Sequence, residues 1–121
     1  MMFNSDNNLA MIDFQLTGTG TAAYDLAYFV TQSIEPDQAS ASERVWFDRW
    51  TTGLIAGGVP EAETATLWEQ YRLAAAFCLV YPVVSCSNVD MSNERERALI
   101  TTMIDRFTRA ANELDLIEVM R

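Results

Sequence analysis

The sequence predicts a mainly α-helical fold, in which a short N-terminal β-hairpin is followed by four or five packed helices. The chain has 121 residues, the length of one domain, and half of them are apolar, which is enough to bury a core. From residue 21 onward the apolar residues recur at helical spacing, whereas the two earlier apolar runs are short and separated by turn residues. We therefore treat residues 1–121 as a single domain.

The hairpin is predicted from two apolar runs, residues 1–3 and 9–14, which flank the polar segment 4–8. Asparagine and aspartate tolerate the left-handed conformations of tight turns, so segment 4–8 is typical of a loop. The second run does not alternate with polar residues, as expected of a strand that is covered on both faces. A two-stranded sheet is marginal in water, so these strands resemble the end of a sheet whose remainder is missing or supplied by another chain.

The first two helices are predicted over residues 21–33 and 41–56. Pro36 marks a break between them because proline lacks the N–H that a helix interior requires. Ser40 and Glu43 have the spacing of a capping box, which predicts the start of the second helix at this point.

The third helix is predicted over residues 61–86, with a kink or interruption at Pro82. Its residues 73–86 form the longest apolar run, which is shorter than the roughly 20 residues of a membrane span, so we expect a buried core helix. The last helix, 93–116, is strongly amphipathic. Its predicted apolar face comprises Leu99, Ile100, Met103, Ile104, Phe107, Ala110, Ala111 and Leu114.

Composition excludes several kinds of site. Acidic residues outnumber basic ones by 17 to 8, and a net charge of −9 repels phosphate backbones, so we expect no nucleic-acid partner and no membrane association. The chain has no histidine, and all its basic residues are arginines. It cannot by itself supply a histidine base or a lysine phosphate clamp. Cys78 and Cys86 lie roughly 12 Å apart along a helix, too far for a disulfide, so we expect reduced, buried cysteines in a cytoplasmic protein.

Two carboxylates are the best candidates for chemistry. Asp13 lies near the end of a buried strand that opens into the glycine-containing loop 17–20, a position where Mg²⁺-binding acids occur in phosphoryl-transfer enzymes. The alternative is an aspartate that caps the next turn. Asp25 is the only charge in a helix that is apolar nearly all round, so we expect it to be buried and hydrogen-bonded by backbone N–H groups. The alternative is that its side chain points outward.

The remaining patterns favour structural roles. Trp46, Trp50, Trp68 and Tyr71 are expected in the core, although aromatic and acidic side chains lining a cleft could hold a cationic or steroid-like ligand. Loop 17–20 does not complete a phosphate-binding motif and is expected to be a tight turn. Segment 4–8 lacks the glycine and the distal glutamate of a calcium loop.

Over residues 1–34 these elements resemble the aminoglycoside phosphotransferase/choline kinase-like superfamily, and most of all its ecdysteroid kinase-like branch. The resemblance rests on Met2-Phe3, then Ile12-Asp13-Phe14-Gln15, then Gly18 and Gly20, then Tyr24-Asp25-Leu26-Ala27-Tyr28-Phe29, in the family's order and spacing. The helices that follow are similar to the family's C-terminal helices but carry weaker motifs.

The resemblance implies a role for each candidate carboxylate. Asp13 corresponds to the Mg²⁺-binding acid that follows the catalytic loop, like the aspartate of the protein-kinase Asp-Phe-Gly segment. Asp25 corresponds to the helix aspartate that supports the catalytic loop. Members of the family transfer the γ-phosphoryl group of ATP, or sometimes GTP, to a hydroxyl of a small molecule.

The family's catalytic aspartate and metal-binding asparagine would lie just before Met1, and its lysine-bearing lobe earlier still. We therefore expect a partial domain, the C-terminal part of the large lobe, that has no catalytic residue of its own and is inactive alone. Mg²⁺ and ATP belong to the intact family, and we expect this chain alone to bind neither.

Two other interpretations stay open. The chain could be a stand-alone helical interaction module or one half of a split kinase, acting as a homo-oligomer or with a complementing chain through its exposed face. It could also be an unrelated acidic helical binding protein whose N-terminal motif arose by chance.

Overall fold

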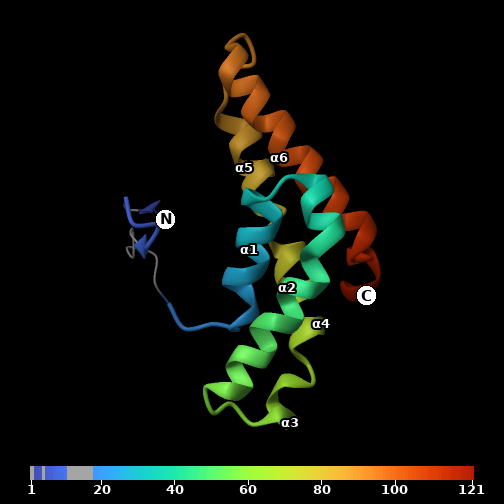
Figure 1. Cartoon of the computed structure of the whole chain (residues 1–121). Coiled ribbons are helices and arrows are strands. Elements are labelled where there is room, and N and C mark those ends of the chain that lie inside the picture. Colours follow the sequence, from blue (N-terminus) through green and yellow to red (C-terminus); the bar gives the residue numbers. More distant parts are fainter. Residues whose placement is uncertain (1, 4, 11–17) are drawn as a thin grey trace.

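The computed structural model describes residues 2, 3, 5–10 and 18–121. Within them the chain is mainly α-helical, with a short two-stranded hairpin at the N-terminal end, and this confirms the predicted fold class (Figure 1). Five helices of nine residues or more and two single-turn helices follow the hairpin in the described residues.

The hairpin consists of β1 (Met2–Phe3) and β2 (Leu9–Ala10), which pair antiparallel with Met2 opposite Ala10 and Phe3 opposite Leu9. Asn7 in the connecting turn has a φ of 61°, a conformation that asparagine tolerates better than most residues. The predicted second strand continues to residue 14, but residues 11–14 lie outside the described part of the chain. The hairpin stands apart from the helices, and the described residues 5–10 are all exposed (Figure 1).

The first two long helices are α1 (Ala23–Ser33) and α2 (Pro36–Ala56). The second begins four residues before the predicted capping box, so that prediction was wrong. Pro36 occupies the first helical turn, where a backbone N–H has no acceptor within the helix, so proline costs no hydrogen bond there. The fixed φ of proline also suits the helix. Ser40 instead donates a hydrogen bond of 3.0 Å to the Pro36 carbonyl from within the helix, and Glu43 turns into the core.

The end of α2 is closed by two glycines. Gly58 has a φ of 101°, which glycine adopts without steric cost. The Val59 N–H donates to the Leu54 carbonyl at 3.0 Å, and the Gly58 N–H donates to the Ile55 carbonyl at 3.0 Å. This pair of bonds is the Schellman arrangement that satisfies the last carbonyls of a helix.

The predicted helix 61–86 is divided into α3 (Glu61–Thr64), α4 (Leu67–Phe77) and α5 (Val80–Asn88). The break between α4 and α5 follows from Pro82, because a proline ring clashes with the carbonyl four residues earlier, here that of Cys78. The interruption attributed to Pro82 is therefore confirmed. The earlier break at residues 65–66 was not predicted.

The last long helix is α6 (Glu94–Glu113), followed by the single turn α7 (Leu116–Val119). The Asn93 side chain caps α6 by accepting hydrogen bonds from the N–H groups of Arg95 and Glu96. The chain reverses between the two helices at Asp115, whose φ of 49° is left-handed. The predicted helix 93–116 is therefore confirmed except at its C-terminal end.

The core lies where α1 and α4 cross, with α2, α6 and α7 packed around them. Small side chains let α1 and α4 approach closely: Ala23 and Ala27 on α1, and Ala74 and Ala75 on α4, are all buried. Tyr71 is the largest side chain that is fully buried.

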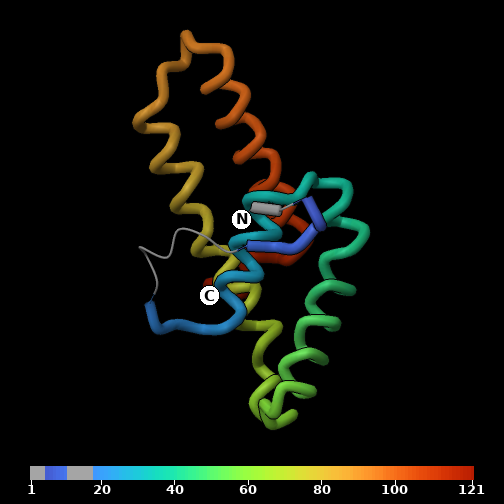
Figure 2. The backbone as a smooth tube through the Cα atoms, turned by 60° about the vertical axis from the view of Figure 1, so that its left-hand side comes forward, coloured from blue at the N-terminus to red at the C-terminus, as the bar shows by residue number. Residues whose placement is uncertain are grey.

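The helical hairpin of α5 and α6 projects beyond the other helices (Figure 2). On α6 the predicted apolar face is only partly covered: Ile100, Ala110 and Leu114 are buried, whereas Leu99 and Ile104 are exposed. The predicted apolar face is therefore covered in part, and α5 is the helix that packs against the projecting half of α6 (Figure 2).

Neither cysteine of the chain is in a disulfide. Cys78 is buried, as expected, but Cys86 is exposed on α5, which corrects the expectation that both are buried. None of the helices in the described residues has the length and apolar character needed to cross a membrane.

Candidate functional site

Asp13, the predicted metal ligand, lies outside the described residues, as does Thr17 at the start of the predicted glycine loop. Gly18 and Gly20 are described and exposed, and no atom lies close enough to exclude a side chain at either position. The role of Asp13 therefore stays a prediction.

Asp25 lies in the first turn of α1 and is exposed, so the predicted burial was wrong. Helix α1 turns Ala23, Ala27 and Val30 toward the core, and Asp25 lies exposed on another side of the helix. Within the described residues Asp25 has no hydrogen bond and no ion pair. Support of a catalytic loop by Asp25 stays a prediction, and its carboxylate is free for such a contact.

An apolar groove of about 320 Å³ runs between the start of α1 and the middle of α4. The side chains that line it are Thr21, Tyr24, Gln70, Leu73, Ala74 and Phe77. The Thr21 hydroxyl donates to the Gln70 side-chain oxygen, so these two polar groups at one end of the groove are already paired with each other. The groove thus offers apolar contact and few unpaired donors or acceptors.

An aromatic cluster of Tyr24, Tyr28, Phe77 and Tyr81 adjoins this groove. The Tyr24 and Tyr81 hydroxyls are hydrogen-bonded to each other. Burial raises the pKa of the Tyr24 hydroxyl, and the Tyr81 hydroxyl raises it further. Burial likewise raises the pKa of Tyr28. These phenols therefore stay neutral near pH 7 and act as hydrogen-bonding, apolar walls, not as bases.

A buried polar network joins three helices and was not predicted. The Glu43 carboxylate on α2 accepts hydrogen bonds from the Tyr71 hydroxyl on α4 and from Arg109 Nη1 on α6. Burial, together with the Glu43 charge, raises the pKa of Tyr71. Arg109 Nε is buried without a hydrogen-bond partner in the described residues. Each of these groups is paired within the core, so the network stabilises the helices and does not face a ligand.

One signal for this network was present in the sequence. Glu43 lies four residues after Ala39 and four before Phe47, and both neighbours are buried. Helical periodicity therefore places Glu43 on the apolar face of α2. A buried carboxylate needs charged or hydroxyl donors, but periodicity alone does not identify Tyr71 and Arg109 as those donors.

The predicted core role of the aromatic residues is confirmed for Trp50, Trp68 and Tyr71, which surround Phe47. Trp46 is half-buried and lies outside this cluster. The guanidinium of Arg44 lies 4.3 Å from the centre of the Trp68 ring and covers the solvent side of the cluster.

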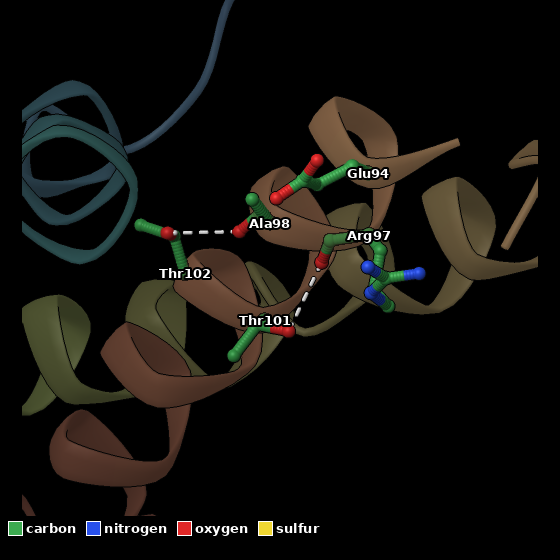
Figure 3. A pocket seen from close by; sticks show the side chains of 5 residues that line it. All are labelled: Glu94, Arg97, Ala98, Thr101 and Thr102. Carbon is green, nitrogen blue, oxygen red and sulfur yellow. Dashed lines mark hydrogen bonds between the residues drawn. The ribbon is translucent and has the colours of Figure 1, made fainter. Parts of the chain in front are cut away.

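A second hollow, of about 440 Å³, lies along the first half of α6 (Figure 3). It is lined by Glu94, Arg97, Ala98, Thr101 and Thr102. Both threonine hydroxyls donate to carbonyls of their own helix, those of Arg97 and Ala98. Because these hydroxyls are turned to the backbone, the hollow has little left with which to orient a ligand.

Metal-binding groups are not assembled in the described part of the chain, where no three Asp, Glu or Cys side chains lie close enough to hold an ion. A single carboxylate does not hold Mg²⁺ against water. A Mg²⁺ site at Asp13 would therefore need further oxygen ligands beside that carboxylate.

The hairpin, the glycine-containing segment and a helix that contains Tyr24-Asp25-Leu26 follow one another in the first part of the chain. Residues 1–56 match the model of the ecdysteroid kinase-like family, which belongs to the aminoglycoside phosphotransferase and choline kinase superfamily. The match spans the hairpin, α1 and α2, confirms the resemblance of residues 1–34, and argues against a chance motif. No curated protein and no solved structure matches the chain.

Proposed function

We propose that this chain forms the C-terminal part of the large lobe of an ATP-dependent kinase that phosphorylates a hydroxyl of a small molecule. The observation that carries the proposal is the family match over residues 1–56, which contains the ordered segments Ile12-Asp13-Phe14 and Tyr24-Asp25-Leu26. In phosphoryl transfer the protein supplies mainly positioning and charge stabilisation, and an aspartate at this place serves that chemistry.

Asp13 would be one ligand of the Mg²⁺ ion that bridges the ATP phosphates and neutralises the developing charge. Asp25, exposed at the first turn of α1, would accept hydrogen bonds from the loop that carries the catalytic base. Its lack of a partner in the described residues supports this assignment, because a carboxylate that serves another segment is free when that segment is not bound.

The 121 residues alone would be inactive and would bind neither ATP nor Mg²⁺. They contain no lysine to contact the β- and γ-phosphates and no histidine. The net charge of −9 further opposes the binding of a polyphosphate and favours a cationic or neutral acceptor over an anionic one.

A complementing chain is the second candidate, with this chain as an interaction module or one half of a split kinase. The exposed hairpin favours it, because both of its strands are two residues long and their outer edges lack a partner strand in the described residues. We place the protein in the cytoplasm, where its two free cysteines stay reduced. The same negative charge argues against nucleic-acid and membrane partners.

The test begins by sequencing the transcript ahead of the Met1 codon. We expect an in-frame catalytic loop preceded by a lysine-bearing lobe. The chain and this extended form are then incubated with Mg²⁺, radiolabelled ATP and a panel of small hydroxyl compounds. We expect transfer only from the extended form, and a loss on the order of 10²-fold or more for Asp13→Asn.

Asp37→Asn, which changes another exposed aspartate in a first helical turn, is the matched control and should leave activity unchanged. Transfer by the 121 residues alone that depends on Asp13 would contradict the proposed inactivity. An extended form that keeps full activity with Asp13→Asn would contradict the metal role of Asp13. An upstream frame without a catalytic loop would instead favour a complementing chain.

A further inference from the structure

The segment 73–89 contains no charged side chain, although 21% of the residues of the chain are charged. Six of its large apolar side chains are exposed, Leu79 and Val83 among them, and the other four recur at helical spacing: Leu73 by 55%, Phe77 by 63%, Val80 by 40% and Val84 by 53%. We refer to these four residues as the α4–α5 stripe. Soluble monomers rarely leave such a run of apolar side chains in water without a partner.

The stripe has the spacing of a helix-pairing surface. Its residues are separated by four, three and four positions, the alternation that places apolar side chains along one side of a helix that packs on another helix. The backbone of Cys78 and Leu79 stays right-handed helical, with φ, ψ of −62°, −11° and −56°, −26°. The chain thus continues from α4 into α5 through a right-handed turn, without a reversal of direction.

Little within the described chain covers this side. Helix α5 packs against α6, and Pro82 is its only buried residue. Figure 2 shows the α5–α6 hairpin projecting into open space, with the other helices gathered at its base.

We propose that the α4–α5 stripe is the interface of a homodimer, in which α4 and α5 of two copies pack side by side about a two-fold axis. Three observations identify the occupant as a second copy: the charge of the chain, the size of the apolar surface and the groove beside it.

Charge argues for pairing through this surface. Two copies that each carry −9 repel one another wherever their acidic faces meet. If two copies instead meet through segment 73–89, this segment brings no like charges together, because it contains none. A strongly basic partner would bind the acidic surfaces instead, where electrostatic attraction is stronger. The stripe therefore suits an uncharged apolar surface, such as the stripe of a second copy.

The area is sufficient for a specific contact. With the exposed neighbours Tyr28 and Val83, the stripe leaves on the order of 500 Å² of apolar surface open on each copy. A two-fold contact over it buries on the order of 1,000 Å² in total, at the lower end of the range for specific interfaces. We therefore expect a reversible dimer and not an obligate one.

The groove of about 320 Å³ beside the stripe makes the surface complementary to itself. Leu73 and Phe77 form one wall of the groove and are also its most exposed apolar side chains. In a two-fold contact each copy presents a protruding side chain and an adjacent hollow, so Phe77 of one copy can occupy the groove of the other.

The dimer does not depend on the proposed kinase function, because its interface contains neither Asp13 nor Asp25, and the four residues of the stripe lie outside the matched residues 1–56. The dimer also differs from the binding of a complementing chain, which would contact the N-terminal hairpin and the exposed side of α1 that carries Asp25.

Sedimentation equilibrium of the 121-residue chain tests the proposal. We expect a reversible change from the 13.6 kDa monomer to twice that mass as concentration rises through the micromolar range. Phe77→Glu and Val84→Glu each place a like charge in both copies and should weaken the dimer by about 100-fold or more. Val45→Glu, which adds the same charge at a 65% exposed valine on α2, is the matched control and should weaken it by no more than about threefold.

A cross-linking experiment locates the contact independently. In a Cys86→Ser background, Val80→Cys should form a disulfide-linked dimer under mild oxidation, and Val45→Cys should not. A chain that stays monomeric at all concentrations overturns the proposal, as does a dimer that survives both glutamate substitutions. Equal weakening by Val45→Glu overturns it too, since net charge and not the stripe would then control association.

Discussion

At the scale of single residues, the Glu43–Tyr71–Arg109 network is the feature that most constrains the fold. Glu43 and Arg109 are both almost fully buried, and each would be costly to bury alone. The network brings α2, α4 and α6 to a common point, because the Glu43 carboxylate of α2 accepts a hydrogen bond from each of the other two helices.

Removal of one charge from this pair should be more harmful than removal of both. We expect Arg109→Leu to lower the free energy of unfolding by about 3–5 kcal/mol, because Glu43 is left buried without its cation. The double variant Glu43→Leu/Arg109→Leu should lose less than Arg109→Leu alone. Urea denaturation followed by circular dichroism measures both.

Asp48→Asn is the matched control, since it breaks the exposed Arg44–Asp48 pair of 3.1 Å and should cost no more than about 1 kcal/mol. A double variant less stable than Arg109→Leu would show that the network contributes more than the balance of its two charges.

Asp25 should contribute little to the stability of this chain, in contrast to Arg109. Its exposed carboxylate gains only from the N-terminal end of α1, so Asp25→Asn should cost about 0.3–1 kcal/mol in thermal or urea unfolding. Asp37→Asn, in the first turn of α2, should cost a similar amount. A loss of several kcal/mol for Asp25→Asn alone would mean that this carboxylate has a structural partner.

At the scale of elements, three tyrosines of α1 and α4 make the stability of the chain depend on pH. Burial raises the pKa of Tyr24, Tyr28 and Tyr71 above the value of about 10 that tyrosine has in an unfolded chain. At alkaline pH the unfolded chain therefore loses these protons first, and stability that is fully present below about pH 10 is lost as the pH rises above it.

We expect the urea midpoint to fall between about pH 9 and about pH 11, with the appearance of tyrosinate absorption coinciding with unfolding. Tyr71→Phe should be less stable at neutral pH, since it removes a donor to Glu43, but should show a weaker alkaline dependence. An alkaline dependence that is unchanged in Tyr71→Phe would rule out Tyr71 as one of its sources.

The elements also show what periodicity can and cannot predict. Proline predicts breaks, and Pro82 does interrupt the chain one turn earlier, but Pro36 begins a helix because the preceding Glu35 is extended. The spacing of apolar residues in α6 predicts a helix with one apolar face. This spacing does not show which part of that face another helix covers. Leu99 and Ile104 lie on the predicted apolar face and are nevertheless exposed, where α6 projects from the other helices.

At the scale of the whole molecule, the part that matches the kinase-like family depends on the part that does not. Ala23 and Ala27 of α1 are buried in a cluster with Ala74 and Ala75 of α4, and Phe47 of α2 stacks edge-on against Tyr71. Residues 1–56 by themselves would expose these surfaces to water, so they need α4 and α6 to fold.

The predicted architecture was recoverable from sequence because it depends on local signals: turn residues, helical period and chain length. Asp25 was placed on the wrong side because an apolar helix does not reveal whether a neighbour covers each of its faces. The Arg109 donor to Glu43 was missed because it is 66 residues away in sequence and no local pattern links the two.

Within the described residues, helix α6 is held to the first two helices by side-chain hydrogen bonds at its C-terminal end only. Its side-chain bonds to α1, α2 and the segment between them come from Arg106, Arg109 and Glu113, all in its last eight residues. From Arg106 to the free end at Glu94 the helix runs for about 18 Å, so a rotation of about 5° at the clamped end displaces the tip by about 1.5 Å. A bend of this helix at its clamped end would therefore move the tip of the α5–α6 hairpin most and the base least.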